Sequence, residues 1–270
     1  MQAPDGLTPL QTVDRALLIL SWFTPSRPEL TVAQVARDLG VGRSVASRLL
    51  AALEARQFVT QDAETGRFRL GVRNLDLGAL FLQSHRLVSA ATPYLELLGQ
   101  DQSLMAGANL FILDNGEALR LASYPARPLT RLRVGTHCTA AGKVLLASLP
   151  DPEVERVIAD RGLAPQTVHT ITTAEALWDD LRTVRQRGYA TDLEESHFGG
   201  FCYAAPIRDV SRNTVGAVSV SVTPAGKPSP EQAGRLIQNV IEAARRISES
   251  LGSGPLWVSV SPGQADQAAS

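Results

Sequence analysis

The stretch LGVGRSVASRLLAALEAR, residues 39–56, predicts a helix with two unlike faces. At helical spacing, the apolar face carries Ala46, Leu49, Leu50 and Leu53. The opposite face carries two arginines among small residues, namely Arg43, Ser44, Ser47, Arg48 and Ala51. Small side chains allow close approach to another surface, and guanidinium groups bind phosphate or guanine. This face therefore predicts contact with nucleic acid, against the plainer alternative of a solvated helix surface.

A second short helix is expected just before this one. Thr31 and Gln34 have the spacing of a capping box, which satisfies two backbone amides at a helix start. Apolar residues follow at helical spacing, at Val32, Val35, Ala36 and Leu39. Gly40 stands where a left-handed residue commonly ends a helix. Two short helices joined by a Gly-Val-Gly turn have the spacing of a helix-turn-helix.

Elements on both sides complete the pattern of a winged helix-turn-helix. Upstream, either Thr8 or Thr12 is expected to cap a further helix. Downstream, strand-like runs at residues 58–60 and 68–70 enclose turn residues 62–66, which predicts a two-stranded wing. Arg67 and Arg69 flank the wing tip, where they either contact phosphate or are simply solvated.

Composition limits the class of protein. The chain has 270 residues, which suits about two domains, and its net charge of −1 excludes a global basic field. Between residues 31 and 73, however, seven arginines oppose four acidic residues. Two cysteines, Cys138 and Cys202, do not form a disulfide framework. The sequence shows neither a long apolar run nor a signal-peptide pattern, so we expect a cytoplasmic protein without membrane contact.

Beyond residue 106 the periodicity changes. Residues 108–124 predict a hairpin with its turn at Asp114-Asn115-Gly116, and strands are expected at 188–194, 201–207 and 216–222. Helices are expected from Thr139, Asp151 and Thr173, with a closing helix over 231–251. Hairpins and helices mix without a βαβ rhythm. The second domain is therefore predicted to be α+β, an antiparallel sheet with helices packed against it.

Two features of this domain suggest a binding site. Thr139-Ala140-Ala141-Gly142 begins a helix with small residues, either for close packing or to leave its amides open to an anion. Ser219 and Ser221 lie two apart on a strand and so share a face, which is either a solvent face or the wall of a polar cavity.

Catalytic and metal-binding alternatives have weaker support. His137 and Cys138 are adjacent, so on a strand they would point to opposite faces. The pair of His197 and Cys202 lacks a third group that would orient the base. As metal ligands, the residues His137, His169, His197 and Cys202 have no recognised spacing. We therefore expect no enzyme activity, no metal and no cofactor.

Five ordered blocks carry a family resemblance. They are TVDRALLIL, GVGRSVASRLLAALEARQFV, DAETGRFRLG, HCTAAGKVLLA and GYATDLEES…GFCYAAPIRD…GAVSVSV. Together they resemble the isocitrate-lyase-regulator (IclR) family of bacterial transcription factors over residues 12–251. The chain departs from the family pattern at Gly42, where Pro is frequent, and at Val45, where Thr is common. Val45 lacks the hydroxyl that could contact DNA.

The resemblance implies an architecture. A winged helix-turn-helix is expected over residues 8–71, a linker helix over 72–90 and a GAF-like effector-binding domain over 91–252. The tail beyond this pattern is rich in Ser, Gly, Pro and Gln, so residues 253–270 are expected to be mobile. Homodimers, with tetramers as a further possibility, are implied. Apolar residues on several faces of the linker favour such self-association: Leu75, Leu77, Leu80, Phe81 and Leu82.

The resemblance also implies a function and its sites. It predicts a ligand-responsive regulator, in the first instance a repressor of catabolic genes, which binds a pseudo-palindromic operator in double-stranded DNA. DNA contact is assigned to Arg43, Ser44, Val45, Ser47, Arg48 and Arg67. A small carboxylate effector is assigned to Ala140, Ala141, Asp192, Cys202, Ser219 and Ser221. The competing hypothesis is a metabolite-binding module that acts through protein partners and retains a vestigial DNA-binding head.

Overall fold

The computed structural model describes residues 9–100, 105–126, 132–222 and 227–252. The chain divides into two compact units, Met1–Ser84 and His85–Ser270. Each unit has its own hydrophobic core. The expected mobile tail and Thr8 lie outside the described residues. No helix in the described part of the chain is long and apolar enough to cross a membrane.

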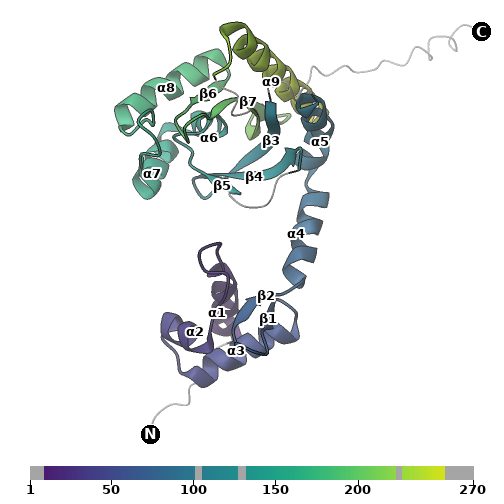
Figure 1. Ribbon diagram of the computed structural model, residues 1–270, viewed down its shortest axis with the longest axis vertical. Coiled ribbons are helices and arrows are strands. Elements are labelled where there is room, and N and C mark those ends of the chain that lie inside the picture. Colours follow the sequence, from purple (N-terminus) through teal and green to yellow (C-terminus); the bar gives the residue numbers. More distant parts are fainter. Residues whose placement is uncertain (1–8, 101–104, 127–131, 223–226, 253–270) are drawn as a thin grey trace, which may run out of the picture. The chain divides into compact units, whose positions relative to one another are not determined.

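The first unit is a winged helix-turn-helix (Figure 1). Its elements are α1 (Pro9–Ser21), α2 (Val32–Leu39), α3 (Arg43–Ala55), β1 (Val59–Gln61), β2 (Phe68–Leu70) and α4 (Arg73–Ser84). The predicted capping box is confirmed, because the Gln34 amide donates to Thr31 Oγ1 at 3.2 Å and the Thr31 amide donates to Gln34 Oε1 at 2.8 Å. Gly40 ends α2 at φ 65°, as expected. Thr12 is not a cap, because α1 already begins at Pro9.

The wing and the core hold the first unit together. Strands β1 and β2 pair antiparallel, with Val59 opposite Leu70. Leu30 adds a bridge on the other side, since Leu30 and Phe68 exchange backbone hydrogen bonds of 2.9 and 2.8 Å. The innermost side chains come from the first three helices, β1 and Leu30: Ile19, Leu30, Val35, Ala46, Leu50 and Val59. The exposed face of α3 is thus fixed to a packed unit by the face behind it.

The linker differs from the single helix expected. Helix α4 ends at Ser84 and α5 (Arg86–Gly99) begins after His85, whose backbone is extended at φ −80° and ψ 104°. No residue of α4 is buried, and Leu75, Leu80 and Leu77 are 69, 58 and 44% exposed. The apolar residues that suggested a packed linker therefore lie on the surface of this chain.

The second unit is built on a six-stranded antiparallel sheet in the order β5-β4-β3-β8-β7-β6. The strands are β3 (Met105–Asp114), β4 (Glu117–Tyr124), β5 (Arg133–Val134), β6 (Ala190–Leu193), β7 (Phe201–Arg208) and β8 (Thr214–Val222). The predicted hairpin turn is confirmed, because Asn115 and Gly116 have φ 50° and 76°, the positive values that a two-residue turn requires.

Helices cover this sheet on both faces (Figure 1). Helices α5 and α9 (Pro230–Ser250) pack together and against the central strands. Helix α6 (Ala140–Ala147) packs on the other face, backed by α8 (Ala174–Arg187), while α7 (Asp151–Arg161) joins the same core. All eight residues of α6 are buried. The expected α+β class is confirmed, and α6 is the innermost of its helices.

Candidate functional site

The outer face of α3 is open and cationic. Arg43, Ser44, Ser47 and Arg48 are exposed, whereas Ala46, Leu49, Leu50 and Leu53 are buried. Neither Arg43 nor Arg48 forms an ion pair with any residue that the structure describes. Val45 differs from its neighbours, because it is half-buried and packs against the core of the unit. The face thus offers two uncompensated guanidinium groups and two hydroxyls.

The wing tip is ordered by one carboxylate. Asp62 accepts hydrogen bonds from the amides of Thr65 at 2.8 Å and Glu64 at 3.1 Å, and these bonds, led by that of Thr65, lower the pKa of Asp62. Arg69 pairs with the same carboxylate at 2.9 Å. The nearest acid to Arg67 is Glu29, at 3.9 Å. Of the two wing arginines, Arg67 is therefore the less neutralised.

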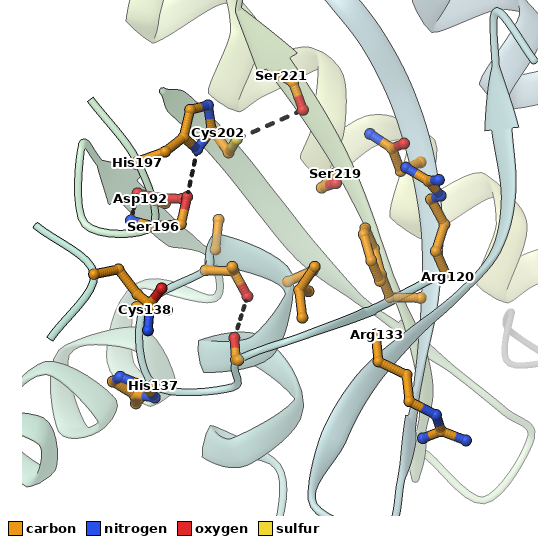
Figure 2. Close-up of a pocket in the computed structure, with 18 of the residues that line it drawn as sticks. Arg120, Arg133, His137, Cys138, Asp192, Ser196, His197, Cys202, Ser219 and Ser221 are labelled. Carbon is orange, nitrogen blue, oxygen red and sulfur yellow. Dashed lines mark hydrogen bonds between the residues drawn. The ribbon is translucent and has the colours of Figure 1, made fainter. Parts of the chain in front are cut away.

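A cavity of about 670 Å³ lies in the second unit, between the sheet and the start of α6 (Figure 2). All six residues assigned to an effector line it: Ala140, Ala141, Asp192, Cys202, Ser219 and Ser221. Strand register explains why distant residues meet there. Cys202 lies opposite Asp192 on β6 and opposite Ser221 on β8, while Ser219 lies opposite Asn109 on β3. Cross-strand partners share a face of the sheet, so these side chains line one wall.

The start of α6 has two open amides. Thr139 Oγ1 accepts the Gly142 amide at 3.2 Å and donates to the Gly135 carbonyl at 2.6 Å. The amides of Ala140 and Ala141 have no partner among the described residues. Gly142 is required here, because a Cβ atom would lie 2.4 Å from Thr136 Cα. The helix start therefore presents two N–H groups and its positive dipole end to the cavity.

Asp192 is occupied within its own loop. Its buried carboxylate accepts the amides of Glu195 at 2.8 Å and Ser196 at 3.2 Å, and the Ser196 hydroxyl at 2.6 Å. Burial raises the pKa of Asp192 in spite of these bonds. The family resemblance assigns Asp192 to the effector, and the residue does line the cavity. In the structure its first role is to shape residues 192–196 at the wall of the cavity.

Two cysteines and two histidines line the cavity: His137, Cys138, His197 and Cys202. Burial, together with the charges of Asp192 and Glu195, raises the pKa of Cys138 to about 11, so its thiol stays neutral. His137 Nε2 lies 3.1 Å from the Ala164 carbonyl, and burial lowers the pKa of its ring. Cys202 Sγ donates to Ser221 Oγ at 3.5 Å. Within the described ranges, no three His, Cys, Asp or Glu side chains are grouped to hold a metal ion.

Two family models match the chain. Residues 12–63 match the IclR helix-turn-helix domain, and residues 79–249 match the bacterial transcriptional regulator IclR C-terminal domain. The chain belongs to the IclR family. IclR-family proteins are transcriptional regulators with a DNA-binding helix-turn-helix and a C-terminal domain for a small-molecule effector. The α3 face lies in the first of these domains and the cavity in the second.

Individual IclR-family relatives cover almost the whole chain. The HTH-type transcriptional repressor AllR of Klebsiella pneumoniae is 30% identical, over 94% of both chains. The crystal structure of a transcriptional regulator from Rhodococcus sp. RHA1 is 30% identical, with a TM-score of 0.73 over 90% of this chain and 98% of that one. An IclR homologue from Microbacterium hydrocarbonoxydans, solved with 4-hydroxybenzoate, has a TM-score of 0.73 at 23% identity and covers 90% and 100%.

Sequence reasoning missed several residues of the cavity in this IclR-family chain. They are Asn109, Phe111, Arg120, Arg133, Gln166, Ser196, His197 and Phe198, among others. Asn109 and Phe111 alternate on a strand paired with β8, so correct register would have found them. The loop residues had no such signal. Arg133 pairs with Asp114 and projects away from the other labelled side chains, whereas Arg120 lies on the far side of the cavity from Asp192 (Figure 2).

Proposed function

We propose that this IclR-family chain is a repressor that binds a pseudo-palindromic operator and responds to a small organic acid. The observation that carries the proposal is the exposed α3 face, where Arg43 and Arg48 stand among small residues without an ion-pair partner in the described chain. A protein surface normally intersperses charges of both signs. A helix fits the major groove of DNA, and two arginines without ion-pair partners on its exposed face can bind guanine edges or phosphate.

The remaining DNA contacts follow from the same unit. Ser44 and Ser47 are small enough for α3 to enter the major groove, and Arg67 on the wing supports a phosphate contact. Because Val45 packs inward, we propose that it supports the helix more than it reads bases. We propose that the DNA-binding domain spans residues 8–71 and that the effector-binding domain spans residues 91–252. Operator DNA also implies a cytoplasmic location.

For the effector we propose a carboxylate held by the amides of Ala140 and Ala141. The dipole end of a helix favours an anion by roughly 0.3–2 kcal/mol, and small side chains leave the approach open. Ser219, Ser221 and Cys202 supply hydrogen-bonding groups on the sheet wall. A cavity of about 670 Å³ has the size of sites for organic molecules. The fold is known to hold an aryl carboxylate, 4-hydroxybenzoate, in the Microbacterium homologue.

A mobility-shift assay tests the proposal and separates it from a metabolite-binding module that acts through protein partners. The DNA probes are the regions upstream of the gene for this chain and of its neighbours. We expect one of them to be bound in preference to scrambled DNA of equal length, and to be released by an organic acid. Equal retention of all probes at physiological salt would favour the protein-partner alternative, because nonspecific binding rests on phosphate contacts alone.

Self-association is the next prediction. Leu10, Val13 and Leu17 on α1 are 80, 56 and 61% exposed, and α4 exposes Leu75 and Leu80. Exposed apolar faces of this extent mark protein interfaces. We expect light scattering to give a dimer or tetramer at micromolar concentration, and the double variant Leu17→Glu, Leu80→Glu to shift toward monomer. Leu97→Glu, 64% exposed on α5, is the control. A monomeric wild type would contradict the proposal.

A further inference from the structure

A buried lysine joins three parts of the effector domain behind the cavity. Lys143 lies on α6 and is 1% exposed. Its ammonium lies 2.7 Å from Glu195 Oε1, in the loop after β6, and 2.9 Å from Asp180 Oδ2 on α8. Helix α6 begins with the open amides of Ala140 and Ala141. The cation is thus one turn from the proposed anion site, with its charge already directed to two acids.

The acids around Lys143 outnumber it. Asp192 accepts the Glu195 amide through its own carboxylate, so a third acid belongs to the same cluster. Asp192 and Glu195 are buried, whereas the side chain of Asp180 is 22% exposed. With every group ionised, three acids would face one lysine. Even with Asp180 partly exposed to water, the buried Asp192 and Glu195 would carry one negative charge more than Lys143 compensates, and burial of unpaired charge is costly. Glu195 Oε2 is buried and has no hydrogen-bond partner in the described chain. An orphaned carboxylate oxygen is a natural position for a proton.

The other charged and titratable groups around the cluster do not remove this excess. On the segment before α6, the Cys138 thiol is neutral and His137 is held at a carbonyl oxygen. In the loop, His197 Nδ1 lies 2.9 Å from Ser196 Oγ. On the sheet, β7 and β8 contribute Cys202, Ser219 and Ser221, while Arg120 and Arg133 stand on the opposite side (Figure 2). Burial, ahead of the opposing effect of Lys143, raises the pKa of Glu195, as it does for Asp192.

We propose that the cavity takes up a proton when it binds an anionic effector, and that the Asp192–Glu195 pair holds this proton while Lys143 compensates the remaining acid charge. Asp192 and the amides of Ala140 and Ala141 line the same cavity, so an anion there faces the acid cluster directly. A further negative charge favours the protonated carboxyl. The inference rests on the proposed function, because it needs an anion at the start of α6.

Proton uptake makes effector affinity depend on pH in one direction. If the complex holds one proton more than the free protein, affinity falls as pH rises, by at most about tenfold per pH unit. A neutral ligand of the same shape brings no charge to the cluster and should bind equally across the same range. The acid cluster would therefore make the regulator sense intracellular pH together with its acid effector.

Calorimetry of acid–amide pairs tests this directly. The probes are 4-hydroxybenzoate, benzoate and acetate, each beside its primary amide, titrated at pH 7 in imidazole and in Tris, so that no buffer anion competes for the helix start. These buffers differ in ionisation enthalpy, so the difference in observed heat counts the protons exchanged. For a bound acid we expect uptake of between about half a proton and one proton per chain, and for its amide none.

Two variants locate the proton. Glu195→Gln, which does not line the cavity, should lose at least half of the uptake. Asp179→Asn is the control, because Asp179 is next to Asp180 in the sequence but pairs with Arg182 at the surface. Proton uptake by this variant on acid binding should match that of the wild type. Should Glu195→Gln fail to fold, the pH dependence of wild-type affinity decides alone. Binding of an acid without proton uptake would overturn this inference only, whereas no binding by any of the acids would overturn the proposed carboxylate effector as well.

Discussion

Arg48→Ala is expected to abolish sequence-specific operator binding and to leave the fold intact. The side chain is exposed and has no ion-pair partner in the described chain, so its removal should change the free energy of unfolding by less than about 0.5 kcal/mol. Loss of a bidentate contact to guanine would cost about 1–3 kcal/mol in each half-site. In a dimer both half-sites are affected, which makes this the largest effect expected on the DNA side.

Fluorescence anisotropy at several salt concentrations distinguishes base contact from phosphate contact. A lost phosphate contact would weaken operator and scrambled DNA alike and reduce the salt slope by about one unit. A lost base contact would weaken the operator alone. Arg56→Ala is the matched control, because Arg56 is exposed and follows the same helix as its C-cap, at the end far from Arg43. Wild-type operator affinity in Arg48→Ala would rule out α3 as the recognition helix.

Ala141→Asp is expected to remove the response to the effector while operator binding persists. Ala141 is 3% exposed at the first turn of α6, where its amide is open to the cavity. The new carboxylate would occupy the anion position and repel an acid ligand. Acid side chains stabilise helix starts, so the dipole itself does not oppose the substitution. The repressor should therefore remain on its operator at effector concentrations that release the wild type.

Calorimetry with the releasing acid checks this result. Ala141→Ser serves as the control, since it adds one atom without charge, and thermal melts of both variants detect any loss from crowding in the core. Equal affinity of the acid for Ala141→Asp and for wild type would place the effector elsewhere in the domain.

Much of the winged helix-turn-helix could be predicted from the sequence, because the patterns that define it are local. The capping box at Thr31, the left-handed Gly40 and the apolar stripe of α3 each involve residues within two helical turns. The serine face of β8 was accessible for the same reason, since alternation along one strand is enough to define it. These patterns predicted which side chains would be exposed and which buried before any tertiary contact was known.

The remainder of the site depends on contacts between distant residues. Asn109 joins Ser219 only through the β3–β8 register. In the sequence, Lys143 looks like an ordinary helix residue, because its partners Asp180 and Glu195 lie far along the chain and pair with it only in the folded domain. The break at His85 also had no warning, because no Gly or Pro marks it and the apolar spacing continues through it. Burial, register and ion pairing arise together on folding, so none can be deduced from one segment.

The complete burial of α6 has a consequence for how such a regulator can diversify. Every residue of this helix is buried, with Ala140 and Ala141 at the cavity, and Gly142 has no room for even one further carbon atom. Beyond its first two residues, random substitution in α6 would damage the fold before it altered ligand choice. The loop after β6 is under less constraint, with Phe198 66% exposed and His197 also at the surface. Paralogues derived from this chain would therefore be expected to acquire new inducers through changes in that loop, while the helix start proposed to hold the anion is inherited unaltered.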